Sequence, residues 1–163
     1  MRRAFAIAVA TVLVVGLGAC GGGGSSSPTP TASSGSALLL VRQTAVGLVG
    51  LSSSPDHLLL LELPLEFSNG SNVGCNLNYG RLQIFEADVE IERSEVTAED
   101  IVAQAGSNLV AQGAPLRATL IFNFNTQVIE EAGLTVSATD HNGNAIERQI
   151  MSLDVEAAPE LLE

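Results

Sequence analysis

From residue 37 onward, apolar and polar residues mostly alternate with a period of two, the pattern of strands with one buried face. The clearest strand runs from Leu59 to Phe67, where every odd position is leucine or phenylalanine. Pro64 lies on its other face, and because proline has no N–H, we expect this strand at a sheet edge or a bulge. Residues 116–124 form a second clear strand with Phe122 and Phe124 inward.

The segments around the first of these strands are less regular. Residues 38–51 are apolar but contain Gly47 and Gly50, which predicts one strand with a kink or bulge. Residues 52–56 have the composition of a turn. Residues 68–80 are rich in asparagine and glycine, which favours a loop that holds at most a short strand at Leu77 and Tyr79.

Residues 82–91 are predicted to form a third strand, with a bulge where the apolar set changes phase between Ile84 and Phe85. After the change, Phe85, Ala87, Val89 and Ile91 are expected to face inward. Four acids are expected to form an outward row: Glu86, Asp88, Glu90 and Glu92. This row is interpreted either as the solvated, charged face of an edge strand or as a binding face for a basic partner or a metal.

One short helix is predicted after Thr97, which is a suitable N-cap. Glu99 and Asp100 would lie in its first turn, where acids suit the helix dipole. Gly106 would end it in the left-handed conformation usual at a helix C-terminus. The helix would then connect two sheets.

The last strands are predicted at residues 134–139 and 145–155, separated by a turn at 140–144. In the second of them, Met151, Leu153 and Val155 are expected inward. About seven strands, short connections and one small helix predict an all-β sandwich over residues 37–156, followed by an acidic tail at 157–163.

The stretch from Thr135 to Asn144 resembles the closing hairpin of bacterial immunoglobulin-like and fibronectin type III-like domains, in which a strand ends in Asp and a Gly-Asn turn precedes the last strand. The resemblance implies an immunoglobulin-like sandwich. The chain lacks tryptophan and the paired cysteines of antibody-type domains, so it implies no antibody-like detail.

Residues 1–19 have a different pattern, that of an export signal. Arg2 and Arg3 precede an apolar run that is too short to span a bilayer, since a spanning helix needs about 20 apolar residues. Small residues at 18–19 suit a peptidase. Residues 21–36 then contain almost only Gly, Ser, Thr and Pro, the composition of a disordered linker.

The residues Leu17-Gly18-Ala19-Cys20 resemble the lipobox of bacterial lipoproteins. The resemblance implies cleavage before Cys20, acylation of its thiol and anchoring of the chain in a membrane of the cell envelope. Gly21 stands where an aspartate would favour the inner membrane, so the outer membrane is favoured if the cell is Gram-negative. The alternative is an ordinary secretory signal in which Cys20 is incidental.

The charge of the chain excludes one class of partner. Without residues 1–19 the chain has five arginines, no lysine and eighteen acids, a formal charge of about −13. Such a chain repels nucleic acid, because binding of phosphates depends on Lys and Arg. The acidity is interpreted either as solvation alone or as attraction for divalent cations.

Calcium is the cofactor for which the sequence offers the best candidate ligands. Asp140, Asn142 and Asn144 present oxygens at alternate positions, as calcium loops and the linkers of cadherin-like domains do. However, Ala145 and Met151 stand where an EF-hand needs Gly and Glu. The alternative is a hairpin turn built from residues that accept positive φ.

Residues for catalysis are few. Cys75 has no partner for a disulfide if Cys20 is acylated, and the sequence leaves open whether it is buried or reactive. His57 and His141 lie in predicted turns, and no Gly-x-Ser-x-Gly or phosphate-binding motif is present. The leading hypothesis is therefore a lipid-anchored envelope protein with a non-catalytic, protein-binding or structural role. The alternatives are a calcium-responsive module or an enzyme of unrecognised type.

Overall fold

The computed structural model describes residues 35–126, 129 and 131–158. The predicted signal segment, Cys20 and most of the linker lie outside the described residues, as does the end of the acidic tail. The described residues contain ten strands and one helix. The strands are β1 (Leu39–Gln43), β2 (Gly47–Leu51), β3 (Leu59–Asn69), β4 (Cys75–Glu86), β5 (Val89–Thr97), β6 (Leu109–Val110), β7 (Leu116–Phe124), β8 (Glu131–Asp140), β9 (Ala145–Ile150) and β10 (Val155–Ala157).

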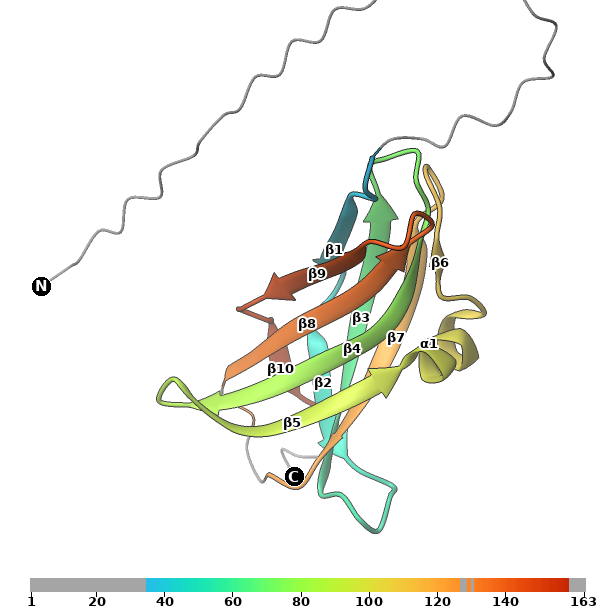
Figure 1. Ribbon diagram of the computed structural model, residues 1–163. Helices are drawn as coiled ribbons and strands as arrows, with labels where there is room; N and C mark the ends of the chain where they lie inside the picture. The colour runs from blue at the N-terminus through green and yellow to red at the C-terminus, as the bar shows by residue number, and fades with distance from the viewer. Residues whose placement is uncertain (1–34, 127–128, 130, 159–163) are drawn as a thin grey trace, which may run out of the picture. The chain divides into compact units, whose positions relative to one another are not determined.

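The strands form two five-stranded sheets that pack face to face (Figure 1). In the first sheet, β3 pairs with β7 on one edge and with both β1 and β2 on the other, and β10 pairs in parallel with β2. In the second sheet, β4 pairs with β8 on one edge and with β5 and β6 on the other, and β9 pairs with β8. The prediction of an all-β sandwich with one short helix is confirmed, although ten strands replace the expected seven or so.

Strand β3 lies in the interior of its sheet, so the expectation that Pro64 marks an edge is wrong. The reason is that its neighbour is broken: β1 ends at Gln43 and β2 begins at Gly47, so the predicted single strand is two. The carbonyl of Pro64 accepts the N–H of Thr44 in this gap. N–H and C=O of one strand residue point to the same side, so the donor that proline lacks faces the gap between β1 and β2.

The third predicted strand is also wrong in part, because the chain reverses within it. Strand β4 starts at Cys75, earlier than expected, and ends at Glu86. Ala87 and Asp88, with φ of 49° and 66°, form the turn to β5. Two positive φ values are typical of a type I′ hairpin turn. The predicted bulge is confirmed, since the pairing of β4 with β5 shifts between Ile84 and Phe85.

The helix α1 (Ala98–Ala105) agrees with its prediction. The Thr97 hydroxyl accepts the N–H of Asp100, whose carboxylate accepts the N–H of Thr97, which completes a capping box. Gly106 ends the helix at φ 77°. The helix buries Ile101 and connects β5 in one sheet to the region before β7 in the other.

The end of the chain differs from the single predicted strand over residues 145–155. It divides into β9 and β10, which belong to different sheets. Met151 lies between them and is exposed rather than inward. Leu153 and Val155 pack against the core, as expected.

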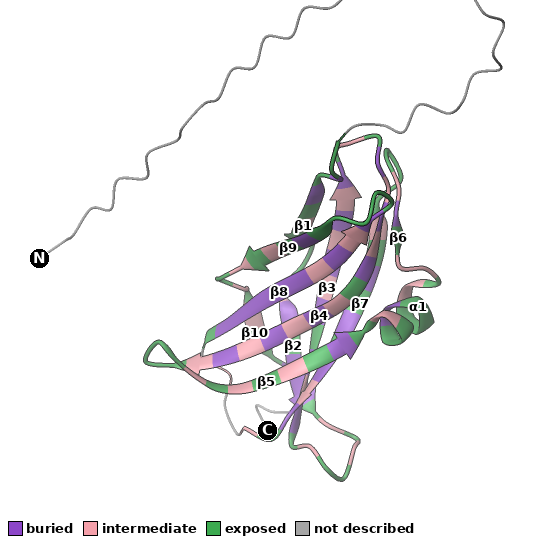
Figure 2. Cartoon of the chain, in the orientation of Figure 1, coloured by how far each residue is buried: buried purple, intermediate pink, exposed green. Residues whose placement is uncertain are grey.

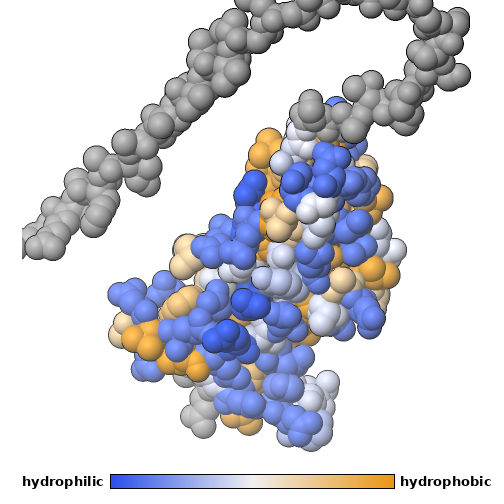
Figure 3. All heavy atoms as spheres, in the orientation of Figure 1, coloured by the Kyte–Doolittle hydropathy of each residue, from blue (hydrophilic) through white to orange (hydrophobic). Residues whose placement is uncertain are grey.

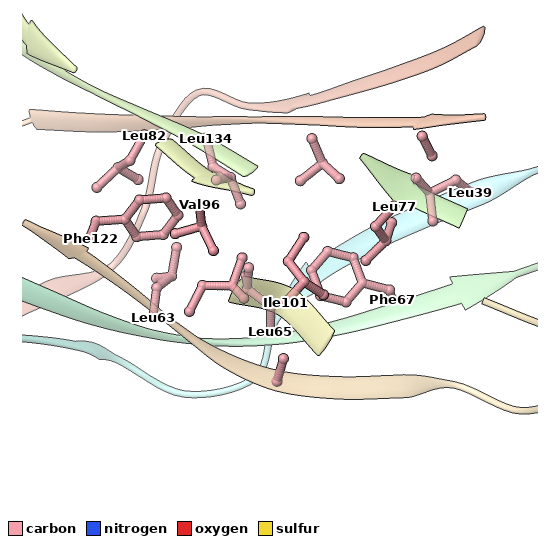
Figure 4. Close-up of a cluster of buried hydrophobic side chains, with 14 of the residues drawn as sticks. Leu39, Leu63, Leu65, Phe67, Leu77, Leu82, Val96, Ile101, Phe122 and Leu134 are labelled. Carbon is pink, nitrogen blue, oxygen red and sulfur yellow. The ribbon is translucent and has the colours of Figure 1, made fainter. Parts of the chain in front are cut away.

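The core lies between the sheets, where the inward rows of both interdigitate (Figure 4). Alternation of buried and exposed residues along the strands is visible in Figure 2, and it follows the period of two in the sequence. The largest fully buried side chains come from both sheets: Phe67, Phe122, Phe124, Leu39, Leu61, Leu63, Leu65, Leu77, Leu82, Ile84, Ile101 and Leu120.

Candidate functional site

The turn between β8 and β9 is organised by Asp140, which is buried. One carboxylate oxygen accepts the N–H groups of Asn142 and Asn144, at 2.9 and 2.8 Å. The other accepts the side-chain amide of Asn144 at 2.9 Å and the N–H of Ala37 at 3.2 Å. Gly143 has φ 85°, and its N–H bonds to the Asp140 carbonyl at 2.9 Å.

These four N–H donors lower the pKa of Asp140 below its ordinary value, the side-chain amide of Asn144 being the largest cause. Both carboxylate oxygens already accept hydrogen bonds, and the amides of Asn142 and Asn144 act as donors, to the Gly35 carbonyl and to Asp140. The geometry thus has the features of the hairpin alternative. Binding of calcium by Asp140, Asn142 and Asn144 stays a prediction.

The first described residues, 35–39, lie at the same end of the sandwich. The Gly35 carbonyl accepts from Asn142, and the Leu38 N–H donates to the hydroxyl of Ser71 at 3.3 Å. The Leu39 carbonyl accepts from the guanidinium of Arg148 at 2.9 Å. Together with the bond from Ala37 to Asp140, these contacts fix the first described residues to the β3–β4 loop and the β8–β9 hairpin.

Cys75 pairs with Asp140 across β4 and β8, and it is fully buried and free. Burial raises the pKa of its thiol, and the nearby Asp140 carboxylate adds to the effect. A raised pKa reduces the thiolate fraction, which is the reactive form. The structure therefore answers part of the question that the sequence left open: Cys75 is a buried, free thiol.

The four acids expected in one outward row do not lie on one face. Glu86 ends β4, and Asp88 lies in the turn. The bulge sends the next two acids in different directions. Glu90 accepts from Gln83 and pairs with Arg93 at 2.9 Å, on the outer face of its sheet.

Glu92 instead reaches the neighbouring sheet. Its two carboxylate oxygens accept the backbone N–H groups of Asn125 at 2.7 Å and Thr126 at 2.8 Å, just beyond β7. The hydroxyl of Ser94 accepts the N–H of Asn123 at 3.2 Å. Side chains of β5 thus cover donors at the edge of β7, which would otherwise be open to pairing with another strand.

Val89 and Ile91, expected to face inward, are exposed. In the space-filling view, hydrophobic groups are visible toward the free end of the β4–β5 hairpin, on a face that is otherwise mostly hydrophilic (Figure 3). Val89 pairs with Glu86 next to the turn, and Ile91 is left unpaired at the bulge, so the alternation of one continuous strand does not apply there.

The two histidines lie at different ends of the domain. His57 is in the β2–β3 loop, where its ring nitrogen is 3.3 Å from the Ser54 hydroxyl. His141 follows β8, and its ring packs against Gly74. Among the described residues, no group of three or more His, Cys, Asp or Glu side chains could hold a metal ion.

The outer face of the first sheet carries a surface that the sequence analysis missed. Cross-strand pairing places Leu48 and Ile121 on either side of Glu62, with Leu60 next along β3. We call these four residues the Glu62 patch. Leu48 and Ile121 are 45% and 40% exposed, although both lie within strands. Leu60, apolar in the outward row of β3, was the sequence signal for it.

Comparisons with known proteins give no family. No family model matches the chain, and no curated protein matches it. Among solved structures, the chain is similar to the putative ApaA protein of Bordetella pertussis, with 16% identity over 71% of this chain and 89% of the other, at a TM-score of 0.47. It is also similar to the structural genomics target SoR45, with 18% identity over 78% and 91%, at 0.47.

The sporulation control protein Spo0M of Bacillus subtilis is a third similar structure, with 16% identity over 77% of this chain and 51% of Spo0M, at a TM-score of 0.38. Similarities at this level assign neither a family nor a function. Within residues 35–126, 129 and 131–158, no helix has the length and hydrophobicity needed to cross a bilayer.

Proposed function

We propose that this protein is a lipid-anchored component of a bacterial cell envelope with a non-catalytic role in protein interaction or structure. The observation that carries the proposal is the sequence Leu17-Gly18-Ala19-Cys20 after a positively charged, apolar segment. Two or three acyl chains on Cys20, as in the lipoproteins that this segment resembles, would make anchoring effectively permanent, because each buried methylene contributes about 0.8 kcal/mol. The outer membrane is the favoured location in a Gram-negative cell.

The first described residues of the domain are held in place by hydrogen bonds. Gly35, Ala37 and Leu39 are held by Asn142, Asp140 and Arg148, which belong to the β8–β9 hairpin. The outer faces of the two sheets would supply the surfaces for contacts with other proteins.

We further propose that the sandwich is immunoglobulin-like, of the fibronectin type III kind. The strand order supports this: β1 and β2, β3 and β7 form one sheet, while β5, β4, β8 and β9 form the other in that order. The antiparallel hairpin of β8 and β9, with its turn at Asp140, also supports it, although β10 and not β9 is the last strand. Domains of this architecture have many unrelated functions, so the proposed role depends on its surfaces and not on its fold.

The test is the intact mass of the protein extracted from membranes, compared with a Cys20→Ser variant. We expect a chain that begins at Cys20 and carries added acyl mass, and we expect the variant to lose this mass and to leave the membrane fraction. A wild-type chain that is cleaved but unmodified and freely released would contradict the anchor. A chain that retains residues 1–19 would contradict the export signal as well.

A further inference from the structure

We propose that the Glu62 patch on the outer face of the first sheet is a docking site for a lysine side chain of another protein. The inference deepens the proposed function and rests on its interaction role.

The first step is the position of Glu62 among apolar neighbours. Directly opposite residues in an antiparallel sheet lie on one face, with Cβ atoms about 4.5–5.5 Å apart. Leu48 in β2 and Ile121 in β7 both lie opposite Glu62, and Leu60 is two residues away on the same face. Both opposite residues are exposed. An exposed carboxylate is therefore bordered on both sides by exposed aliphatic side chains.

The second step is the contrast with Glu66, which lies on the same face of β3. Glu66 binds Arg42 and Arg117, each at 2.8 Å, and its side chain is only 13% exposed. These arginines, Arg117 foremost, lower its pKa. Glu62 has no ion pair with any described residue, and neither has Glu156, whose β10 pairs it with Leu48. The patch thus has uncompensated negative charge.

The third step is the shape of the surface. A hollow of about 140 Å³ is lined by Leu48, Leu51, Leu60, Glu62 and Ala158, together with Gly50. Pockets for metabolites and drugs are usually about 300–1,000 Å³. This hollow is too small for them, but it has the scale of a single side chain.

Lysine fits these features better than arginine. Its four methylenes cover apolar surface while the ammonium group at the end remains near a charge or water. Arginine favours two-point contacts with carboxylates. In the patch, the aliphatic stem would lie against Leu48 and Leu60, and the ammonium group would meet Glu62.

The partner must be a different protein, because this chain contains no lysine. A second copy could offer only arginine, and its charge would oppose association: the full sequence has a formal net charge of −11. The chemistry of the surface therefore indicates a partner with exposed lysine next to apolar residues.

The lack of lysine also gives a direct test by zero-length cross-linking. A water-soluble carbodiimide activates the Glu62 carboxylate, the lysine amine of the partner attacks the carbonyl carbon, and the urea leaves. The product is an isopeptide bond, with the net loss of one water. We would treat membranes that contain the full chain, digest the products and search by mass spectrometry for peptides joined through Glu62.

We expect an isopeptide between Glu62 and one lysine of one partner. Glu62→Gln should abolish it, and Leu48→Ser should lower its yield several-fold. Glu99→Gln, which removes an exposed carboxylate on α1, should leave it unchanged. Replacing the identified lysine of the partner by glutamine should lower co-purification about tenfold or more. Thermal unfolding of each variant checks that the domain remains folded.

Other outcomes overturn the inference. Isopeptides only at other carboxylates would place the interaction on another surface, and a dimer without a cross-link at Glu62 would make a second copy the occupant. Either result leaves the lipid anchor intact if the mass of Cys20 shows acylation. Conversely, an unmodified Cys20 would overturn the envelope anchor without affecting the result at Glu62.

Discussion

At the scale of single residues, Asp140 connects three parts of the chain that are distant in sequence. Its carboxylate accepts hydrogen bonds from Ala37, Asn142 and Asn144, and it lies opposite the buried Cys75. An aspartate two residues before Asn-Gly in a hairpin turn could be expected from the sequence. The bond to Ala37, 103 residues away, could not, because no local pattern encodes it.

We expect Asp140→Asn to lower the melting temperature, because an amide accepts these N–H bonds more weakly than a carboxylate. The folded-state pKa of Asp140 is lowered. Its contribution to stability is therefore fully present above the unfolded pKa and is lost as the pH falls through the lower folded pKa. Thermal unfolding followed by circular dichroism between pH 7 and pH 2 measures this.

The matched control for that experiment is Asp56→Asn, which changes an exposed aspartate in the β2–β3 loop. The control should follow the wild-type acid profile, whereas Asp140→Asn should lack the component that Asp140 contributes. Identical profiles for both variants would show that the bonds at Asp140 contribute no net stability.

Ala87 and Asp88 form a turn where the sequence pattern predicted a continuous strand. Neither is glycine or asparagine, yet both have positive φ. Left-handed backbone costs roughly 1–2 kcal/mol for an ordinary L-residue such as Ala87, and no Asn-Gly or Asp-Gly pair stands there to signal a hairpin turn. The turn forms because pairing of β4 with β5 buries Leu82, Ile84 and Val96, which outweighs the local cost.

Replacing Ala87 and Asp88 by Asn and Gly should therefore stabilise the protein by about 1 kcal/mol, since Asn-Gly suits a type I′ turn. Urea unfolding gives the free energy. Ala103→Gly, on the exposed side of α1, should instead lower the free energy of unfolding by about 1 kcal/mol. If the Asn-Gly variant were no more stable than the wild type, the turn would not be strained.

At the scale of elements, alternation was a reliable guide wherever a strand has one face on the core. It predicted β3, β7 and β8 and their inward residues. It failed in residues 38–51, where the polar run Arg42-Gln43-Thr44 marks the break between β1 and β2. It also failed where asparagine and glycine fill a paired strand, as at the start of β4. Long-range pairing sets those boundaries, and a single sequence does not display it.

The sequence also did not predict the hydrogen bonds between side chains of β5 and the edge of β7. Removing the carboxylate with Glu92→Ala should cost about 1–3 kcal/mol, because two N–H groups lose a charged acceptor. The loss should be local as well. Hydrogen exchange at the amides of Asn125 and Thr126 should become faster, while exchange in β8 should change little.

Glu95→Ala is the control for Glu92→Ala, because it removes a carboxylate from the same strand. Glu95 pairs with Arg81, and the side chains of Arg81 and Glu95 are 34% and 43% exposed, so the loss of Glu95 should cost less than about 1 kcal/mol. Equal costs for the two variants, with unchanged exchange at residues 125–126, would contradict the role assigned to Glu92.

At the scale of the whole molecule, the sequence predicted the class of fold because class depends on the period of hydrophobic residues. The surface was less predictable. The four acids expected in one row do not share a face, because a turn and a bulge interrupt the strand. The Glu62 patch is formed by residues of three strands that come together only in the folded sheet. Sites assembled across strands require the register, and the register depends on the complete fold.

Because the molecule is acidic, a salt can raise its melting temperature in two ways: by general screening of the negative charge or by binding of calcium at a specific site. Net negative charge destabilises a compact chain by self-repulsion, so added salt should raise the melting temperature. Both oxygens of Asp140 already accept N–H bonds, so CaCl₂ and MgCl₂ at equal ionic strength should raise it equally. A specific site would distinguish the ions, because calcium accepts more and longer oxygen contacts than magnesium. A larger rise with calcium, abolished by Asp140→Asn, would establish the calcium-binding alternative, since a ligand that binds only the folded state must stabilise it.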